Sequence, residues 1–203
     1  KTAVIEVAEA CGLHLVSVTK RNPMLASSHG VGELILAAVD EGAEHIIIGL
    51  GGSSSNDGGM GFLQAIGVRF LDISGNQLRG DVSSLSSLSD IDLSYMDPRL
   101  KRISFEVACD VDNPLVGPQG ASAIFASQKG ANSEMIDQLE TILNHYSSVI
   151  SRKFNNDVSL YPGAGAAGGM GYSFKAFLNA ELKSGIKIIL DKVDFNQHLL
   201  NAD

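Results

Sequence analysis

The feature that most constrains the fold of this chain is a glycine- and serine-rich loop at residues 49–61, with the sequence GLGGSSSNDGGMG. The loop follows the apolar run Ile46-Ile47-Ile48 and precedes an apolar-periodic run that begins at Phe62. This order of strand, loop and helix is the unit of which parallel sheets are built. Glycines let a backbone approach a ligand closely, and N–H groups at the start of a helix attract phosphate or carboxylate. A capped turn explains about two or three of these residues, so we interpret the loop as a ligand-binding loop.

The length of the chain fits one large domain or one and a half small ones, and its composition is that of a globular protein or a piece of one. The chain has 203 residues, of which 44% are hydrophobic, and this is enough for a sizeable core. We therefore expect a single α/β domain over residues 1–203. No apolar run approaches the roughly 18 residues that a membrane span needs, and no signal sequence is evident, so we expect a cytoplasmic protein without a membrane partner. Cys11 and Cys109 are far apart, which argues against a disulfide framework or a zinc site.

The formal net charge of −8 argues against a nucleic-acid partner, because a nucleic-acid surface shows clustered Lys and Arg. The same acidity means that an anionic substrate needs locally placed positive charge. Backbone N–H groups, a few cations and a divalent metal ion are the groups that supply it.

The apolar patterns predict an α/β fold with a mostly parallel sheet flanked by helices. Residues 72–102 are Ser-rich and weakly patterned, and we interpret them as a surface excursion of the domain that is anchored by spaced leucines. The expected strands or extended segments are residues 2–7, 15–18, 45–50, 68–71 and 103–109, with a last strand or buried turn at 186–190. The expected helices are residues 8–13, 34–41, 62–66, 121–126, 132–154, 174–181 and 193–203.

Two carboxylates follow the predicted strand at residues 103–109. Asp110 and Asp112 come where ligands bind in open α/β sheets, at the carboxyl end of a strand. They are two apart in an extended segment, so they project to one side and can share a magnesium ion, or divide metal and base duties. Turn chemistry before Pro114 is the alternative explanation. Lys129, after the next helix, either favours the helix dipole or reaches a phosphate.

A second glycine-rich loop, residues 162–171, reads PGAGAAGGMG and contains a G-x-G-x-x-G pattern. An NAD-dependent oxidoreductase acting on hydroxy acids would use this pattern, but that fingerprint requires a strand immediately before it. Here a polar connection and Pro162 precede it, so this function is a minor alternative. Both glycine-rich loops end in Gly-Gly-Met-Gly followed by an aromatic residue. Either the two helix starts face one cleft, or the small residues serve tight packing.

Three segments together resemble the type-1 glycerate kinase family. They are the loop at residues 51–59, the block at 108–115 that continues to 128–130, and the second loop at 162–169. Arg21-Asn22-Pro23 and Gly32-Glu33-Leu34 also fit the family's pattern in order and spacing. At two positions, Ser54 and Ser55, the family usually has Ala and Thr. The resemblance covers essentially the whole chain.

This resemblance implies ATP-dependent phosphorylation of D-glycerate, usually to 2-phosphoglycerate, in a protein with two α/β domains and a cleft between them. Proteins of the family are nearly twice as long. They carry earlier Asp-Ser-Phe-Lys and Asp-Gly-Gly-Glu-Gly motifs and a later Thr-Gly-Glu-Gly loop, which these residues lack. We therefore expect the chain to be an inserted domain that supplies one wall of the cleft and has the missing N- and C-terminal segments as its partners. The alternative is an anion-binding domain that is catalytically inert on its own.

The expected ligands are D-glycerate, ATP and Mg²⁺. No Walker sequence is present, so the nucleotide is not held in the P-loop manner. Asp57, or Asp110 with Asp112, is expected to hold the magnesium ion or to accept the proton of the attacking hydroxyl, with Asp57 and Asp110 as the catalytic candidates. The residues expected to bind substrate or phosphate are Arg21, Gly51, Gly52, Ser53, Ser54, Ser55, Asn56, Gly58, Gly59, Lys129, Gly163, Gly165, Gly168 and Gly169.

Overall fold

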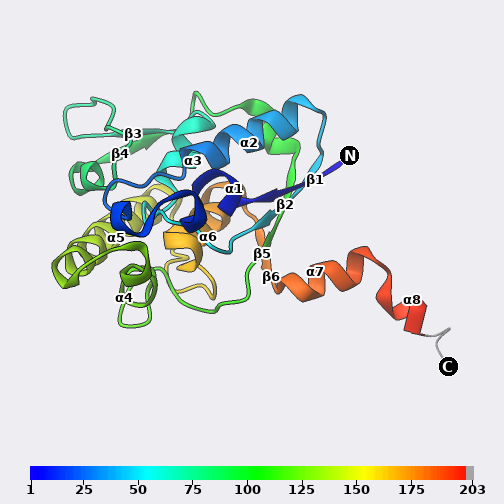
Figure 1. Ribbon diagram of the computed structural model, residues 1–203. Helices are drawn as coiled ribbons and strands as arrows, with labels where there is room; N and C mark the ends of the chain where they lie inside the picture. Colours follow the sequence, from blue (N-terminus) through cyan, green and yellow to red (C-terminus); the bar gives the residue numbers. More distant parts are fainter. Residues whose placement is uncertain (200–203) are drawn as a thin grey trace.

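A computed structural model of the chain describes residues 1–199. Its main feature is a four-stranded parallel sheet in the order β1-β2-β5-β6, which confirms the expected α/β class (Figure 1). The strands are β1 (Thr2–Glu6), β2 (His45–Gly49), β5 (Ser104–Ala108) and β6 (Glu181–Lys183). Their register aligns Ile5 with Ile48 and Ile48 with Val107. The carboxyl ends of β2 and β5 therefore lie at one edge of the sheet.

One face of this sheet packs into the hydrophobic core. Because side chains alternate along a strand, Ile5, Ile48 and Val107 point to the same face, where they share a core with residues of α2 (His29–Asp40) and α6 (Ala166–Leu178). The residues just before these three in each strand, Val4, Ile47 and Glu106, point to the opposite face. There Val4 is exposed, and Glu106 is only half-buried.

The longest helix is α5 (Ser133–Phe154), and it forms as the sequence predicts. Asn132 caps its start by accepting a hydrogen bond from Met135 N at 2.9 Å, and Asn155 ends it with φ 50°. Its apolar stripe is buried. The remaining helices are α1 (Val7–Cys11), α3 (Met60–Ala65), α4 (Ala121–Phe125), α7 (Gly185–Lys192) and α8 (Phe195–Leu199). No helix of the described range is long and apolar enough to cross a membrane.

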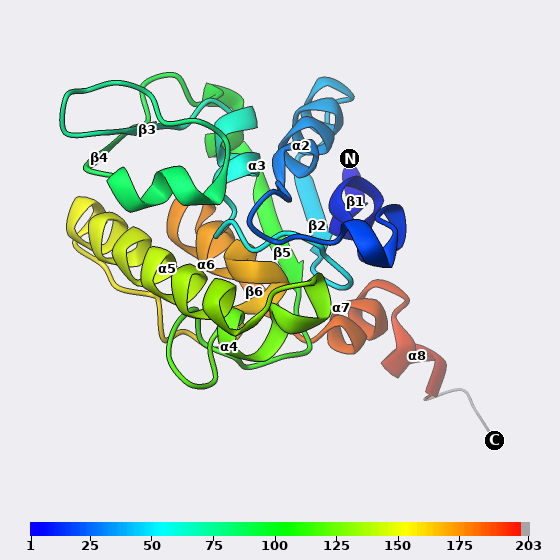
Figure 2. The same cartoon turned by 60° about the vertical axis from the view of Figure 1, so that its left-hand side comes forward.

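The expected strand at residues 68–71 exists, but not in the parallel sheet. β3 (Arg69–Leu71) pairs antiparallel with β4 (Asp90–Asp92), and this ribbon lies apart from the main sheet (Figure 2). Between and after these strands run the 3-10 helices η3 (Val82–Ser87) and η4 (Pro98–Arg102). Leu85, Leu88 and Leu100 of this part of the chain are buried in the hydrophobic core.

The extended segment expected at residues 15–18 is shorter than predicted, because Val16 is extended with φ −119° and ψ 122° but Leu15 and Val18 belong to 3-10 helices. These residues connect two 3-10 helices, η1 (Leu13–Leu15) and η2 (Val18–Lys20), whose hydrogen bonds are local. Val16 N bonds to Leu13 O at 3.3 Å, and Lys20 N bonds to Ser17 O at 2.8 Å. A short β-branched run has no strand partner here, so local turns satisfy its backbone instead.

The end of the described chain also differs from the prediction. The helix expected to reach residue 181 ends at Leu178, because Asn179 adopts the left-handed region with φ 49°, and residues 181–183 form β6. The apolar run 186–190 belongs to α7 instead of a strand, since a short apolar run does not distinguish the two by periodicity. The helix expected at 193–203 appears as α8, and its last four residues lie outside the described range.

Candidate functional site

The glycine-rich loop at residues 49–61 follows β2, and its first residues line a cavity of about 230 Å³. Leu50 N still bonds to Ala108 O at 3.2 Å, which extends the pairing of β2 with β5 by one residue. The cavity lies at the carboxyl ends of these two strands, where ligands bind in open parallel sheets. Its lining comes from the three segments that carry the family resemblance, namely the first glycine-rich loop, the block that runs from residue 108 to Lys129, and the second glycine-rich loop. Its lining residues are Leu50, Gly51, Gly52, Ser53, Ala108, Cys109, Asp110, Val111, Phe125, Gln128, Lys129, Ala166 and Ala167.

Lys129 supplies a cation to the wall of this cavity. The residue is 2% exposed, and its Nζ donates to Ser53 Oγ at 3.0 Å and to Ser55 O at 2.6 Å. Burial lowers the pKa of Lys129 to about 8, although the Cys11 thiol and the Asp57 carboxyl partly oppose this shift. A buried ammonium with two neutral acceptors favours a nearby anion, because an anion restores the solvation that burial removed.

The outer part of the loop offers backbone donors next to this lysine. Gly51 forms no hydrogen bond with any residue of the described chain, and it is exposed. Gly52 has φ 71°, and its carbonyl accepts from Leu13 N at 2.8 Å, which turns the loop over the cavity. Unpaired N–H groups of a glycine-rich turn, beside a buried ammonium, form a concave anion site.

The inner serines and asparagine of the loop are buried and are bonded to the protein instead. Ser54 donates to Cys11 O through both its backbone N, at 2.7 Å, and its Oγ, at 2.9 Å. Asn56 Nδ2 donates to Ser122 Oγ at 3.1 Å. The Cys11 thiol contacts Ser55 Oγ, and burial raises the pKa of this thiol to about 11, so it stays protonated. The sequence did not signal that the segment around Cys11 braces the loop.

Asp57 is fully buried, and both of its carboxylate oxygens are occupied. Oδ2 accepts from Ser28 N and Ser28 Oγ, each at 2.8 Å, and from Gly61 N at 3.2 Å. Oδ1 accepts from Gly59 N at 3.1 Å. Asp57 therefore ties the starts of α2 and α3 to the loop. This geometry favours a positioning role over the expected metal-binding or proton-accepting role, because Asp57 is buried in the loop and lines neither the first cavity nor the one beside Asp112.

The second glycine-rich loop packs against the first. Gly58 N donates to Gly168 O at 2.9 Å, and the rings of Phe62 and Phe174 stack at 4.4 Å. The two similar runs therefore meet face to face in the protein interior. Neither Gly58 nor Gly59 of the first loop lines the cavity formed by the described residues.

The glycines of the second loop are needed for close chain packing. A Cβ on Gly168 would lie 2.2 Å from Ser55 O, and one on Gly165 would lie 2.1 Å from Pro114 O. A Cβ on Gly163 would lie 2.8 Å from Cys109 Sγ, and one on Gly169 would lie 2.8 Å from Gly58 Cα. Of the two alternatives for these four glycines, the geometry favours tight packing over phosphate contact. Ala166 and Ala167 face the cavity in their place.

Asp110 and Asp112 line a second cavity of about 400 Å³. This cavity shares Cys109, Asp110 and Val111 with the first, so the segment after β5 separates two adjoining spaces. Asp110 Oδ1 accepts from Ser184 Oγ at 3.0 Å and from Gly185 N at 2.8 Å, so this oxygen is engaged by the start of α7.

Asp110 and Asp112, which line the same cavity, are the carboxylates of this segment that would hold a magnesium ion. Within the described part of the chain, no three His, Cys, Asp or Glu side chains gather into a metal-binding group. Mg²⁺ needs no such group, because it commonly takes one or two carboxylates and completes its shell with water and substrate phosphates. Asp112 is exposed to the second cavity and is available for such a role.

Arg21 lies behind the first cavity. Its guanidinium donates to Leu13 O at 3.3 Å and to Gln128 O at 3.5 Å. It thus joins the segment that braces the loop to the turn that carries Lys129. Arg21 lines neither of these two adjoining cavities, so the geometry favours a bracing role over the expected contact with substrate.

Comparisons with known proteins cover the whole chain. The model of the glycerate kinase family matches residues 1–203. A protein named glycerate kinase from Bacillus cereus is 53% identical over 203 residues, which are 100% of this chain and 53% of that protein. A glycerate 2-kinase from Escherichia coli is 53% identical over 199 residues, 98% of this chain and 52% of that protein.

A solved structure agrees with these relatives. The crystal structure of a protein assigned as glycerate kinase 2 from Salmonella typhimurium LT2 superposes with a TM-score of 0.95 at 48% identity. The match covers 100% of this chain and 54% of that chain. The chain therefore spans about half the length of the relatives it matches.

Proposed function

Because the chain belongs to the glycerate kinase family, we propose that the intact protein phosphorylates D-glycerate with ATP and forms 2-phosphoglycerate. The name of the Escherichia coli relative, glycerate 2-kinase, supports phosphorylation at the 2-position. In this proposal residues 1–203 form one α/β domain, inserted between two further segments, and supply one wall of the active-site cleft. The protein acts in the cytoplasm on small molecules.

The observation that carries this proposal is the pair of cavities that meet at residues 109–111. Phosphoryl transfer requires the phosphate donor and the acceptor hydroxyl to be held next to each other, with the attacking oxygen in line with the leaving oxygen. Most of the catalysis comes from this positioning and from stabilisation of charge. The first cavity has the backbone donors and Lys129, which suit a carboxylate or phosphate. The second has Asp112. Asp110 lies at the wall that both cavities share.

Each residue then has a physical role. The N–H groups of Gly51 and Gly52, with the ammonium of Lys129, bind an anionic group of glycerate or ATP and orient it. Asp110 and Asp112 would hold Mg²⁺, which neutralises phosphate oxygens when it is bound. Asp110 is also placed to accept the proton of the attacking hydroxyl. Asp57 maintains the loop without contacting substrate.

The product assay tests the reaction. Full-length enzyme is incubated with D-glycerate, ATP and Mg²⁺, and the product is identified by phosphorus NMR. We expect 2-phosphoglycerate, and formation of 3-phosphoglycerate would contradict the assigned position. The Asp112→Asn variant is expected to need several-fold more Mg²⁺ for half-maximal turnover. Asp137→Asn is its control, because Asp137 is exposed on α5, remote from both cavities of the described structure.

Two further measurements address the alternatives. Residues 1–203 alone are expected to bind anions weakly and to give no turnover, as an inert anion-binding domain would. Turnover by these residues alone would contradict the claim that they supply only one wall. Nicotinamide cofactors are not expected to bind, because the G-x-G-x-x-G run at 163–168 packs on the chain itself. Calorimetric titration with NAD⁺ checks this.

A further inference from the structure

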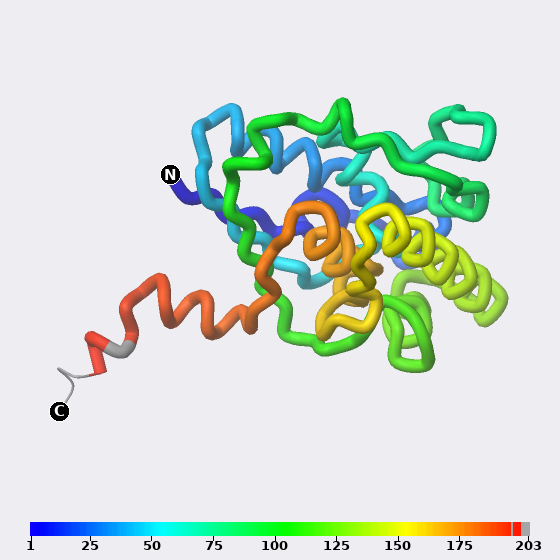
Figure 3. Tube along the Cα trace, turned by 180° about the vertical axis from the view of Figure 1, so that it is seen from behind, coloured from blue at the N-terminus to red at the C-terminus, as the bar shows by residue number. Residues whose placement is uncertain are grey.

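Helix α7 has one apolar residue turned inward and several turned outward. Ile188 is 4% exposed, whereas Ile186 is 60% exposed, Ile189 58% and Val193 51%. The last three positions are spaced by three and four residues, so they form one stripe along the helix. We name Ile186, Ile189 and Val193 the outer stripe. Figure 3 shows this part of the chain leaving the body of the molecule.

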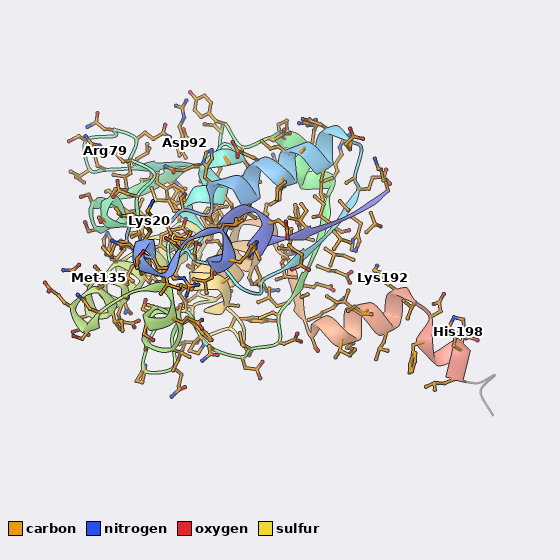
Figure 4. All side chains as sticks on the ribbon, viewed as in Figure 1. Lys20, Arg79, Asp92, Met135, Lys192 and His198 are labelled. Carbon is orange, nitrogen blue, oxygen red and sulfur yellow. The ribbon has the colours of Figure 1, made fainter. Side chains whose placement is uncertain are left out.

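Part of the sheet face beside α7 is also exposed, although Ile47 on this face is buried. Lys192, labelled in Figure 4, lies at the end of α7. Its Nζ is 3.6 Å from Glu106 Oε2 and 3.5 Å from His45 Nε2, so α7 lies on the same face of the sheet as these two side chains, opposite the core. Val4 points to the same face and is 69% exposed. Parallel sheets normally have both faces covered, because the crossover connections of the same chain carry helices onto each face. Within the described part of the chain, α7 contacts β5 on this face.

The start of α7 is fixed at the candidate site. Ser184 Oγ and Gly185 N donate to Asp110 Oδ1, and Asp110 belongs to the wall between the two cavities. The outer stripe begins at the next residue, Ile186. A body that covers the stripe therefore also lies close to the second cavity, of which Ser184 forms part.

We propose that the outer stripe and the exposed face around Val4 are the docking surface for the part of the same polypeptide that lies outside residues 1–203. The chain spans about half the length of its relatives, so a body of similar size is available to cover it. A covering layer from the same chain is what a parallel sheet requires. This inference rests on the proposed function only in taking the intact protein to be longer, and its readout does not depend on turnover.

Hydroxyl-radical footprinting of the full-length protein tests the proposal. The oxidation rates of the outer stripe are compared with those of Ile73, which is 89% exposed on a distant loop, and of buried Ile188. We expect the stripe to react several-fold more slowly than Ile73, at all protein concentrations. Rates close to that of Ile73 would overturn the proposal. Protection that disappears on dilution would also overturn it, because a second copy would then be the occupant.

A variant pair gives an independent readout in the same full-length protein. Ile189→Asp is expected to lower the melting temperature by several degrees, whereas Ile73→Asp is expected to leave it unchanged. Equal melting temperatures would contradict the docking surface. If Ile189→Asp does not accumulate, Ile189→Ser is measured in its place. An active enzyme with a freely oxidised stripe would refute this inference alone, and a protected stripe in a protein without glycerate kinase activity would refute the proposed function alone.

Discussion

The two glycine-rich loops look alike in sequence and differ in what surrounds them. In the first loop, Gly51 has open space around it, and its neighbour Ser53 accepts a hydrogen bond from a buried lysine. In the second loop, Gly165 and Gly168 lie against backbone carbonyls so closely that a methyl group does not fit. The difference teaches that glycine content alone does not identify a ligand loop. Unpaired N–H groups next to a cation, in a cavity, are the more specific sign.

The first loop is itself divided. Its outer residues face the cavity, and its inner residues are bonded to the protein, with Asp57 at the centre of four hydrogen bonds. We therefore propose that the inner part of the loop contributes stability and that the outer part contributes ligand binding.

Asp57→Ala is expected to destabilise the protein by about 4 kcal/mol, because it leaves buried N–H and O–H donors of the loop and of Ser28 without an acceptor. Chemical denaturation measures the change. Asp72→Ala is the control, since Asp72 also accepts three hydrogen bonds, from Ser74 and Asn76, but in an exposed turn. We expect a much smaller loss there, because water replaces the carboxylate as acceptor. Similar losses for the two variants would contradict the central role of Asp57.

Lys129→Met is expected to lower turnover of the full-length enzyme by about 10²- to 10³-fold, because it removes the cation that faces the bound anion. Stability near neutral pH is expected to change little, since a buried charge is replaced by a side chain of similar length. Steady-state kinetics measure the effect. Lys153→Met is the control, because Lys153 pairs with Asp90 at the surface. Unchanged kinetics in Lys129→Met would remove this lysine from the site.

Lys129 also predicts a pH dependence. Its pKa in the folded protein, about 8, lies below the ordinary value of 10.5, so the unfolded chain binds more protons between these two pH values. Stability relative to Lys129→Met is therefore expected to rise as the pH increases from about 8 to 10.5. Anion affinity is expected to fall over the same range, because the ammonium is lost. Denaturation and phosphate titration at several pH values measure both trends.

Gly168→Ala is expected to lower the free energy of unfolding by about 3 kcal/mol. The new Cβ would lie 2.2 Å from Ser55 O, and the residue has φ 70°, which alanine adopts at a cost. Gly75→Ala separates the cost of the positive φ from the cost of the close contact, because Gly75 has φ 81° and open space around it. We expect this variant to lose only about 1 kcal/mol of unfolding free energy. Thermal unfolding compares them. Equal losses would show that packing between the loops contributes nothing.

Gly51→Ala has the smallest expected effect. No atom lies within 4 Å of the position that a Cβ on Gly51 would take, so stability is expected to change by less than about 0.5 kcal/mol. The methyl group narrows access to the unpaired N–H groups, and we expect a loss in kcat/KM of about tenfold, which corresponds to about 1.4 kcal/mol. A stability loss as large as that of Gly168→Ala, with normal kinetics, would reverse the roles assigned to the two loops.

Much of the fold follows from local patterns. The apolar runs of β2 and β5, the stripe of α5 and its Asn132 cap are signals within a few residues of each other, and all of them form as expected. The misassigned segments are short. Residues 15–18 and 186–190 have apolar content compatible with strand or helix, and whether a strand forms depends on a neighbouring strand that local sequence does not specify.

The order of the amino acids alone predicts the α/β class, the position of the first glycine-rich loop after a buried strand, and the resemblance to the glycerate kinase family. These depend on composition, periodicity and residue order along the chain. Only the tertiary structure decided which donors of that loop are free, because hydrogen bonds between distant residues occupy the rest. It turned Asp57 inward toward Ser28, brought Lys129 under the loop, and pressed the second glycine-rich loop against the first. A polar side chain binds a ligand only where its own fold leaves it unpaired.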